Sequence, residues 1–238
     1  MFALMRLCKK IFQIITCARI MSRQHYYVAQ KYSANLSCLS CGEYQIRFLK
    51  VFPAQAAIYW AEKGRRVVYI SPTPLENRPA VCHDRSDPTV AALDLMRFIY
   101  LPDYETLIEQ LVKLHMYAAV PSVLLIDDLD NYFTDETIKN DSFVHIARTC
   151  ALIIHSMKSC SRILKMNVYV CAWTNSILTN NFLQTIYFRN IWNLTEEDEK
   201  IILLEKFAIG LSSKQSYKYH KFKDGMRVLQ QICHSIEA

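Results

Sequence analysis

Glycine is scarce in this chain of 238 residues, which has only Gly42, Gly64, Gly210 and Gly225. The phosphate-binding loop of P-loop nucleotide hydrolases needs two glycines five positions apart, followed by Lys and Ser or Thr. That spacing lets backbone N–H groups wrap the phosphates. No pair of glycines here has the spacing, and no Gly-Lys-Ser/Thr occurs. The sequence therefore excludes a standard loop of this kind.

Long apolar runs and early acidic residues are also missing. No apolar stretch reaches the roughly 18 residues of a membrane span, so no membrane association is expected, although 52% hydrophobic residues can build a core. Residues 1–42 contain six basic residues and no acid, whereas the 22 basic residues that follow balance 22 acidic ones. We interpret 1–42 as a flexible basic extension, in which residues 1–24 alternatively form a mitochondrial transit peptide, and 43–238 as the domain.

The nine cysteines are odd in number and scattered, which excludes a disulfide scaffold and favours a reducing compartment. Cys38 and Cys41 form the only close pair. A zinc site needs a second pair at suitable spacing, and Cys82-His83 lies about forty residues further on. We therefore expect free thiols and no metal site.

Helical and apolar segments alternate through the middle of the chain. Proline at 53 and glycine at 64 suit the ends of a helix. Asp103 is a candidate N-cap for a helix to about residue 117. Further helices are expected near 91–96 and over 141–157, the latter with Val144, Ala147, Ala151 and Ile154 facing inward. Short buried-type strands are expected at residues 67–70, 98–101, 122–128 and 167–173. This order calls for parallel strands with right-handed crossovers.

After residue 182 the pattern becomes that of β-structure. Strands are expected at 187–194 and 201–205, followed by a hairpin of 217–223 and 226–230 around Asp224-Gly225. The acidic run 195–199 is interpreted as a solvated helix start or turn.

The strand at 122–128 ends in two carboxylates, Asp127 and Asp128. An apolar run that closes in this way is typical of the central strand of a RecA-like sheet, where the first aspartate holds Mg²⁺. The alternative is that both carboxylates simply solvate the end of the strand. Thr174 and Asn175 end the next strand and are candidates for sensing phosphate, or else form an ordinary polar loop.

The terminal hairpin gathers cations and aromatic rings. Lys218, Lys221 and Lys223 lie beside Tyr217, Tyr219, His220 and Phe222, with Lys214 and Arg227 at the flanks. Lysine and arginine track phosphates while rings stack on bases, which favours single-stranded nucleic acid. Strand alternation predicts Tyr217, Tyr219, Lys221 and Lys223 on one face. The alternative is an edge hairpin that lysines protect from aggregation.

Several strings, in order, resemble a known family. They are AEKGRRVVYISPTPL at 61–75, LDLMR at 93–97, SVLLIDDLDNY at 122–132, FLQ at 182–184 with Tyr187, Phe188 and Trp192, and the terminal Asp-Gly hairpin. Over residues 54–231 the chain resembles the SWIM-domain-protein-associated ATPases of the animal Shu complex, which are divergent paralogues of RecA-type recombinases.

The resemblance implies a RecA-like, P-loop NTPase-type fold. Its mostly parallel sheet is flanked by helices, with a β-hairpin C-terminal part. It further implies ATP with Mg²⁺ as cofactors, single-stranded DNA, a SWIM-domain zinc protein and a recombinase as partners, and a nuclear location. Asp127 occupies the family's Walker B position. Where the family places its glycine-rich loop, residues 40–47 read SCGEYQIR, so the P-loop is degenerate.

The expected function is that of an accessory protein of homologous-recombination DNA repair, a Shu-complex subunit that binds single-stranded DNA at Lys214, Lys218, Tyr219, Lys221, Lys223 and Arg227. Whether it is an enzyme stays open, because the resemblance implies ATPase activity and the loop is missing. One alternative is an active DNA-stimulated ATPase with an unrecognised phosphate loop. The other is an interaction scaffold that binds no DNA.

Overall fold

The computed structural model describes residues 27–31, 51–75, 87–133, 142–174, 187–188, 190–198, 200–207, 213–222 and 227–236. Within these residues the strands form one sheet in the order β3-β2-β4-β5-β1-β6-β7-β8-β9. Its first half, through β6, is parallel, and the pairs from β6 to β9 are antiparallel. The strands are β1 (Tyr27–Lys31), β2 (Val67–Ser71), β3 (Met96–Tyr100), β4 (Val123–Ile126), β5 (Tyr169–Thr174), β6 (Asn190–Asp198), β7 (Ile201–Phe207), β8 (Ser213–Lys221) and β9 (Arg227–Ile236).

The three strands predicted at the centre lie side by side. β4 pairs in parallel with β2 and with β5, so that Leu125 lies between Tyr69 and Cys171 in register. Each strand is short and apolar because both of its faces are covered, which is the usual state of a parallel sheet. The predicted fold class is confirmed.

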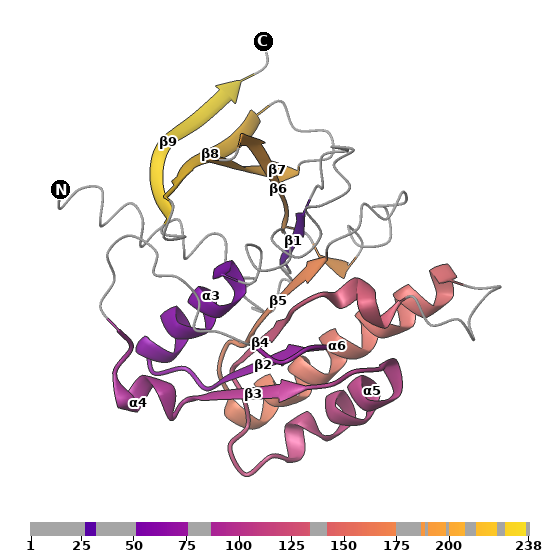
Figure 1. The fold of residues 1–238 in the computed structure, drawn as a ribbon. Helices are drawn as coiled ribbons and strands as arrows, with labels where there is room; N and C mark the ends of the chain where they lie inside the picture. The colour runs from indigo at the N-terminus through magenta and orange to yellow at the C-terminus, as the bar shows by residue number, and fades with distance from the viewer. Residues whose placement is uncertain are drawn as a thin grey trace.

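Helices cover both faces of the parallel part (Figure 1). α3 (Val51–Glu62) and the short α4 (Val90–Leu93) lie on one side, and α5 (Tyr104–Lys113) and α6 (Ser142–Leu164) on the other. The 3-10 turns are η1 (Leu114–Met116) and η2 (Leu129–Tyr132). Gly64 follows α3 with φ +72°, a left-handed conformation that suits glycine. The Asp103 carboxylate caps α5 by accepting from Thr106 N at 2.8 Å, as predicted.

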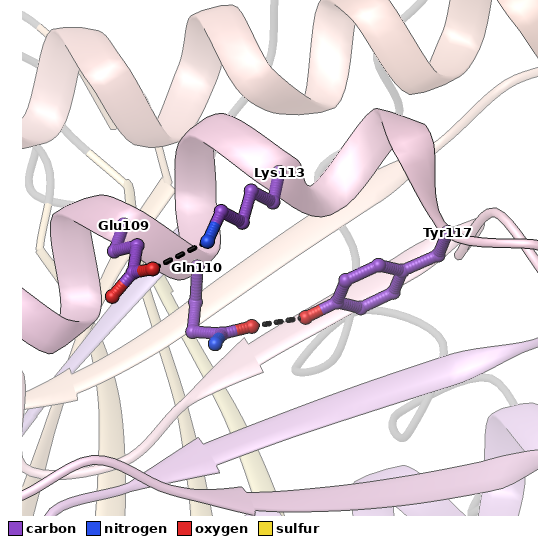
Figure 2. Close-up of polar contacts among 4 residues, drawn as sticks. All are labelled: Glu109, Gln110, Lys113 and Tyr117. Carbon is purple, nitrogen blue, oxygen red and sulfur yellow. Dashed lines mark hydrogen bonds and ion pairs between the residues drawn. The ribbon is translucent and has the colours of Figure 1, made fainter.

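Side-chain contacts are present within α5 and between α5 and Tyr117, the residue that follows η1 (Figure 2). Lys113 forms an ion pair with Glu109 one turn earlier, and the Tyr117 hydroxyl donates to the Gln110 side chain. The Arg97 guanidinium lies over the Tyr117 ring, 4.7 Å from its centroid. Because the ion pair is exposed, we expect it to contribute only about 0.3–0.5 kcal/mol.

The buried face of α6 differs from the prediction. Val144 is 42% exposed and Ala151 is exposed, whereas Ile154 is buried as expected. The buried face is formed by His145, Ile146, Thr149, Cys150, Ile153, Met157 and Cys160. The prediction was wrong for Val144 and Ala151, because the buried face of α6 also takes the polar residues His145 and Thr149. The structure satisfies their polar atoms: the Thr149 hydroxyl donates to the His145 carbonyl at 2.9 Å.

Two hydrophobic cores lie on the two faces of the sheet. The α6-side core joins α5 and α6 to β2, β4 and β5. The α3-side core joins α3 to the parallel strands and also to Ile202, Leu204, Tyr217, Tyr219 and Leu229 of the antiparallel strands. The sheet therefore bends around α3, and β6 to β9 form the curved upper part of Figure 1.

Two segments behave differently from their composition. β1 lies within residues 1–42, which were interpreted as an extension, yet it pairs with β5 and β6 in the middle of the sheet. Residues 195–198 of the acidic run continue strand β6, with a register shift between Glu196 and Asp198. The prediction of a helix start or turn there was wrong.

Several cysteines lie in the buried parts of the described residues. Cys150, Cys160 and Cys171 are buried and form no disulfide. Burial raises the pKa of the Cys150 thiol to about 12 and that of Cys160 to about 11. Cys38, Cys41 and Cys82 lie outside the described residues. Of the helices in the described ranges, none has the length and apolar character of a membrane span.

Candidate functional site

The carboxyl ends of the central parallel strands bring several polar residues to one edge of the sheet. β2 ends at Ser71, β4 leads into Asp127 and Asp128, and β5 ends at Thr174. These strands are neighbours in the sheet. In open α/β sheets this edge is where ligands bind.

β1 lies beside β5, and the chain passes from β1 through residues 32–50 into α3. Gln30, the last residue but one of β1, pairs with Thr174. A strand that leads into a helix at this position is where a phosphate-binding loop would connect the two. The segment 40–47 that the sequence analysis singled out falls in this connection, which lies outside the described residues.

Asp127 is fully buried and held by a phenol. The Tyr69 hydroxyl donates to Asp127 Oδ2 at 2.9 Å, and Asp127 N donates to the Ile70 carbonyl at 2.8 Å. Burial, followed by the nearby Asp127 charge, raises the pKa of Tyr69 far above its ordinary value. The phenol therefore stays protonated and remains a donor throughout the physiological range. A hydrogen bond to a buried carboxylate offsets part of the cost of its desolvation.

Asp128 turns the chain out of the sheet. Its backbone adopts φ 47° and ψ 48°, the left-handed region that aspartate tolerates better than most residues. Asn131 N then donates to the Asp128 carbonyl at 2.9 Å, which starts η2. This turn sets where the second carboxylate lies relative to the first.

A layer of buried aromatic groups supports the turn. The Tyr132 hydroxyl donates to the Leu101 carbonyl at 2.8 Å, and His145 Nε2 lies 3.1 Å from the Tyr132 carbonyl. The His145 ring packs against Tyr104 with 4.1 Å between ring centroids. Sequence reasoning missed this support. The signal was a single histidine, His145, in a helix for which other residues were predicted to face inward.

Thr174 ends β5 as a buried side chain whose Oγ1 has no hydrogen-bond partner among the described residues. Trp173 belongs to the α3-side core, so strand alternation directs Thr174 to the α6 side. Asp127 shares the α3 side with Tyr69. The two predicted polar groups thus reach the same edge from opposite faces. Asn175 lies outside the described residues.

The predicted DNA-binding residues lie in or next to β8 and β9, far along the sheet from β4. Lys214, Lys218, Tyr219 and Lys221 belong to β8 and Arg227 begins β9, while Lys223 lies outside the described residues. Side chains of Lys214 and Arg227 are not described. The Tyr219 ring is only 1% exposed and packs in the α3-side core. Its ring is therefore not available to stack on a base, contrary to the prediction.

No known protein family and no curated protein matches the chain. Among solved structures it is similar to a DnaB-like replicative helicase described with its primase interactions, at 10% identity with a TM-score of 0.53. That match covers 87% of this chain and 59% of the helicase chain. It is also similar to an ATPase domain at 9% identity with a TM-score of 0.53, over 87% of this chain and 85% of that domain. These likenesses show that the chain has a RecA-like ATPase fold.

We predict that Tyr69→Phe lowers the free energy of unfolding by about 2 kcal/mol, because it removes a hydrogen bond to a buried carboxylate. Urea denaturation followed by circular dichroism measures the change. Tyr132→Phe is the matched control, since it removes a bond of similar length to a neutral carbonyl. We expect the control to cost about 1 kcal/mol.

A double-mutant cycle with Asp127→Asn tests the origin of the effect. The cost of Tyr69→Phe should fall when the carboxylate is replaced by a neutral amide, because the charge-assisted part of the bond is lost. Equal costs in the two backgrounds would mean that the Tyr69 hydroxyl does not stabilise the Asp127 charge.

Proposed function

We propose that this protein is an accessory factor of homologous-recombination DNA repair, a Shu-complex subunit that binds single-stranded DNA. In this role it pairs with a SWIM-domain zinc protein and supports recombinase filaments in the nucleus. The observation that supports the proposal best is a RecA-like sheet that keeps Asp127 at its carboxyl edge while the chain lacks the glycine loop. The strings that resemble the family lie mainly in β2, β3 and β4 and their flanks.

The chain differs from the family it resembles in the glycine-rich loop that ATP hydrolysis requires. Phosphate capture by a P-loop needs successive backbone N–H groups directed at one point, which glycines permit. Residues 32–50, between β1 and α3, contain a single glycine, Gly42. Lys31, directly before this segment, and Lys50, its last residue, are not followed by Ser or Thr. We therefore propose that the protein acts through binding rather than through ATP hydrolysis.

An active ATPase is the second candidate, and two observations favour it. β1 lies beside β5 in the sheet and precedes α3 in the sequence, the order expected of a nucleotide-binding fold, and Asp127 follows β4, the strand from which a Mg²⁺ ligand would come. Thr174 adds a buried hydroxyl at the same edge. This candidate needs a phosphate loop of unrecognised sequence in residues 32–50.

The first test of function is nucleotide binding. A ligand that binds only the folded state raises the melting temperature. Because we propose that the protein does not use ATP, we expect Mg²⁺ with ATP to leave the melting temperature unchanged to within about 1 °C. Differential scanning fluorimetry of the full chain measures this. A rise that Asp127→Asn abolishes would overturn the proposal in favour of the ATPase.

Binding of single-stranded DNA is the second test. We expect Lys218→Glu with Lys221→Glu to weaken binding of a fluorescent oligonucleotide at least tenfold and to reduce the slope of log affinity against log salt by about 1.4, if each lysine neutralises one phosphate. Fluorescence anisotropy at several salt concentrations measures both quantities.

The control for this test has the same net charge. Lys113→Glu with Lys165→Glu reverses two exposed lysines that lie in α5 and just after α6, away from β8. It should bind DNA nearly as the unaltered chain does. If both double variants bind alike, or the unaltered chain does not bind DNA, the interaction scaffold without DNA binding is the better description.

Partner identity is the third test. We expect the tagged full chain, expressed in cells, to co-purify with a SWIM-domain zinc protein and to fractionate with nuclei. The physical reason for a partner is a set of exposed apolar side chains on the edge strand β3 and on α4, α5 and η1. These are Val90, Leu93, Phe98, Tyr100, Val112 and Met116. Recovery of mitochondrial proteins instead would contradict the nuclear assignment and favour a transit peptide in residues 1–24, ahead of β1.

A further inference from the structure

Strand β8 divides its side chains between the core and the outside. Tyr217 and Tyr219 are 2% and 1% exposed and pack in the α3-side core. The alternate residues Lys218 and His220 are half-buried, and Phe222, directly after the strand, is 42% exposed. Alternation along a strand therefore gives β8 an outer face that carries Lys218, His220 and Phe222.

The two rings on this outer face contact each other. His220 and Phe222 pack edge to face, with 4.7 Å between ring centroids and 71° between ring planes. Such a pair holds both rings in a defined orientation. Ile201 of β7 and Val228 of β9 pair with His220 on either side, and both are half-buried. The result is a small aromatic platform on an apolar base at the end of the strand.

Charge on this face is arranged along the strand. Lys218 precedes His220 by two residues, which is about 7 Å along an extended chain. The outer face also carries Glu205, which pairs with Ser216 at the end of the segment remote from Phe222. The Lys218 ammonium therefore flanks the platform, and the Glu205 carboxylate, opposite Ser216, lies further from the platform.

We infer that the outer face of β8 is a site for unpaired nucleic acid, in which the Phe222 ring, held edge to face by His220, stacks on a base and Lys218 contacts a neighbouring phosphate. This inference rests on the proposed function and assigns the DNA contact to individual residues of β8 and its end. Aromatic stacking tolerates any base, because every base has a π-face. In a duplex both faces of an internal base are already stacked, so the platform selects single strands.

The test compares an ordinary oligothymidine with an oligonucleotide of the same length that lacks its bases. Fluorescence anisotropy on the full chain should show that the unaltered protein binds oligothymidine about tenfold or more tightly than the abasic strand, as expected for stacking. Phe222→Ala should lose most of that difference while it keeps its affinity for the abasic strand. Phe222→Tyr, which retains a ring, should restore it.

Ile163→Ala is the control, because Ile163 is a large apolar side chain that is 53% exposed and lies in α6, away from β8. It should behave as the unaltered chain. Thermal melting of each variant verifies folding, and Phe222→Leu, which keeps an apolar side chain without a ring, replaces the alanine variant if that one unfolds.

The outcomes separate the inference from the proposed function. If the unaltered chain binds no DNA, both the proposed function and this site are contradicted. Binding that ignores the bases, or that Phe222→Ala and Phe222→Leu leave unchanged, would overturn the aromatic platform while the lysines remain the contact to DNA.

Discussion

The burial of β4 is the constraint on which the rest of the structure depends. All four side chains of Val123–Ile126 are fully buried, alternating between the α3-side and α6-side cores. At about 25 cal/mol per Å² of apolar surface, such a strand contributes strongly to stability. Where its apolar run stops, the chain has to leave the sheet. Asp127 is consequently buried with it, and the Tyr69 hydroxyl makes that burial tolerable.

α3 has a comparable role for the second half of the sheet. It contacts the parallel strands and the antiparallel ones in a single core, so that the sheet bends around it. Tyr217 and Tyr219 are drawn into this core and are lost to any ligand. Packing thus divides these aromatic residues by alternate positions, and His220 in β8 and Phe222 directly after it lie on the outer face.

Much of the fold was predictable from sequence because apolar runs and caps are local signals. The strands β2, β4 and β5, the Asp103 cap and the paired strands β8 and β9 all lie close to their predicted positions. Three features depended on distant partners and were missed. β1 lies in a basic segment and gains its place from β5 and β6. His145 is buried because Tyr132 supplies a carbonyl. The acidic residues up to Asp198 continue β6 because β7 pairs with them.

The sequence by itself determined the absence of a glycine loop, the order of the elements, and the aspartate that ends the central strand, since each depends on residue type and spacing alone. Only the tertiary structure decided which face of β8 is turned inward. Alternation defines two faces of a strand but does not say which of them is buried. The inner face of β8 is the one whose Tyr219 packs in the α3-side core. The same packing decided that Asp127 and Thr174 reach one edge from opposite sides of the sheet.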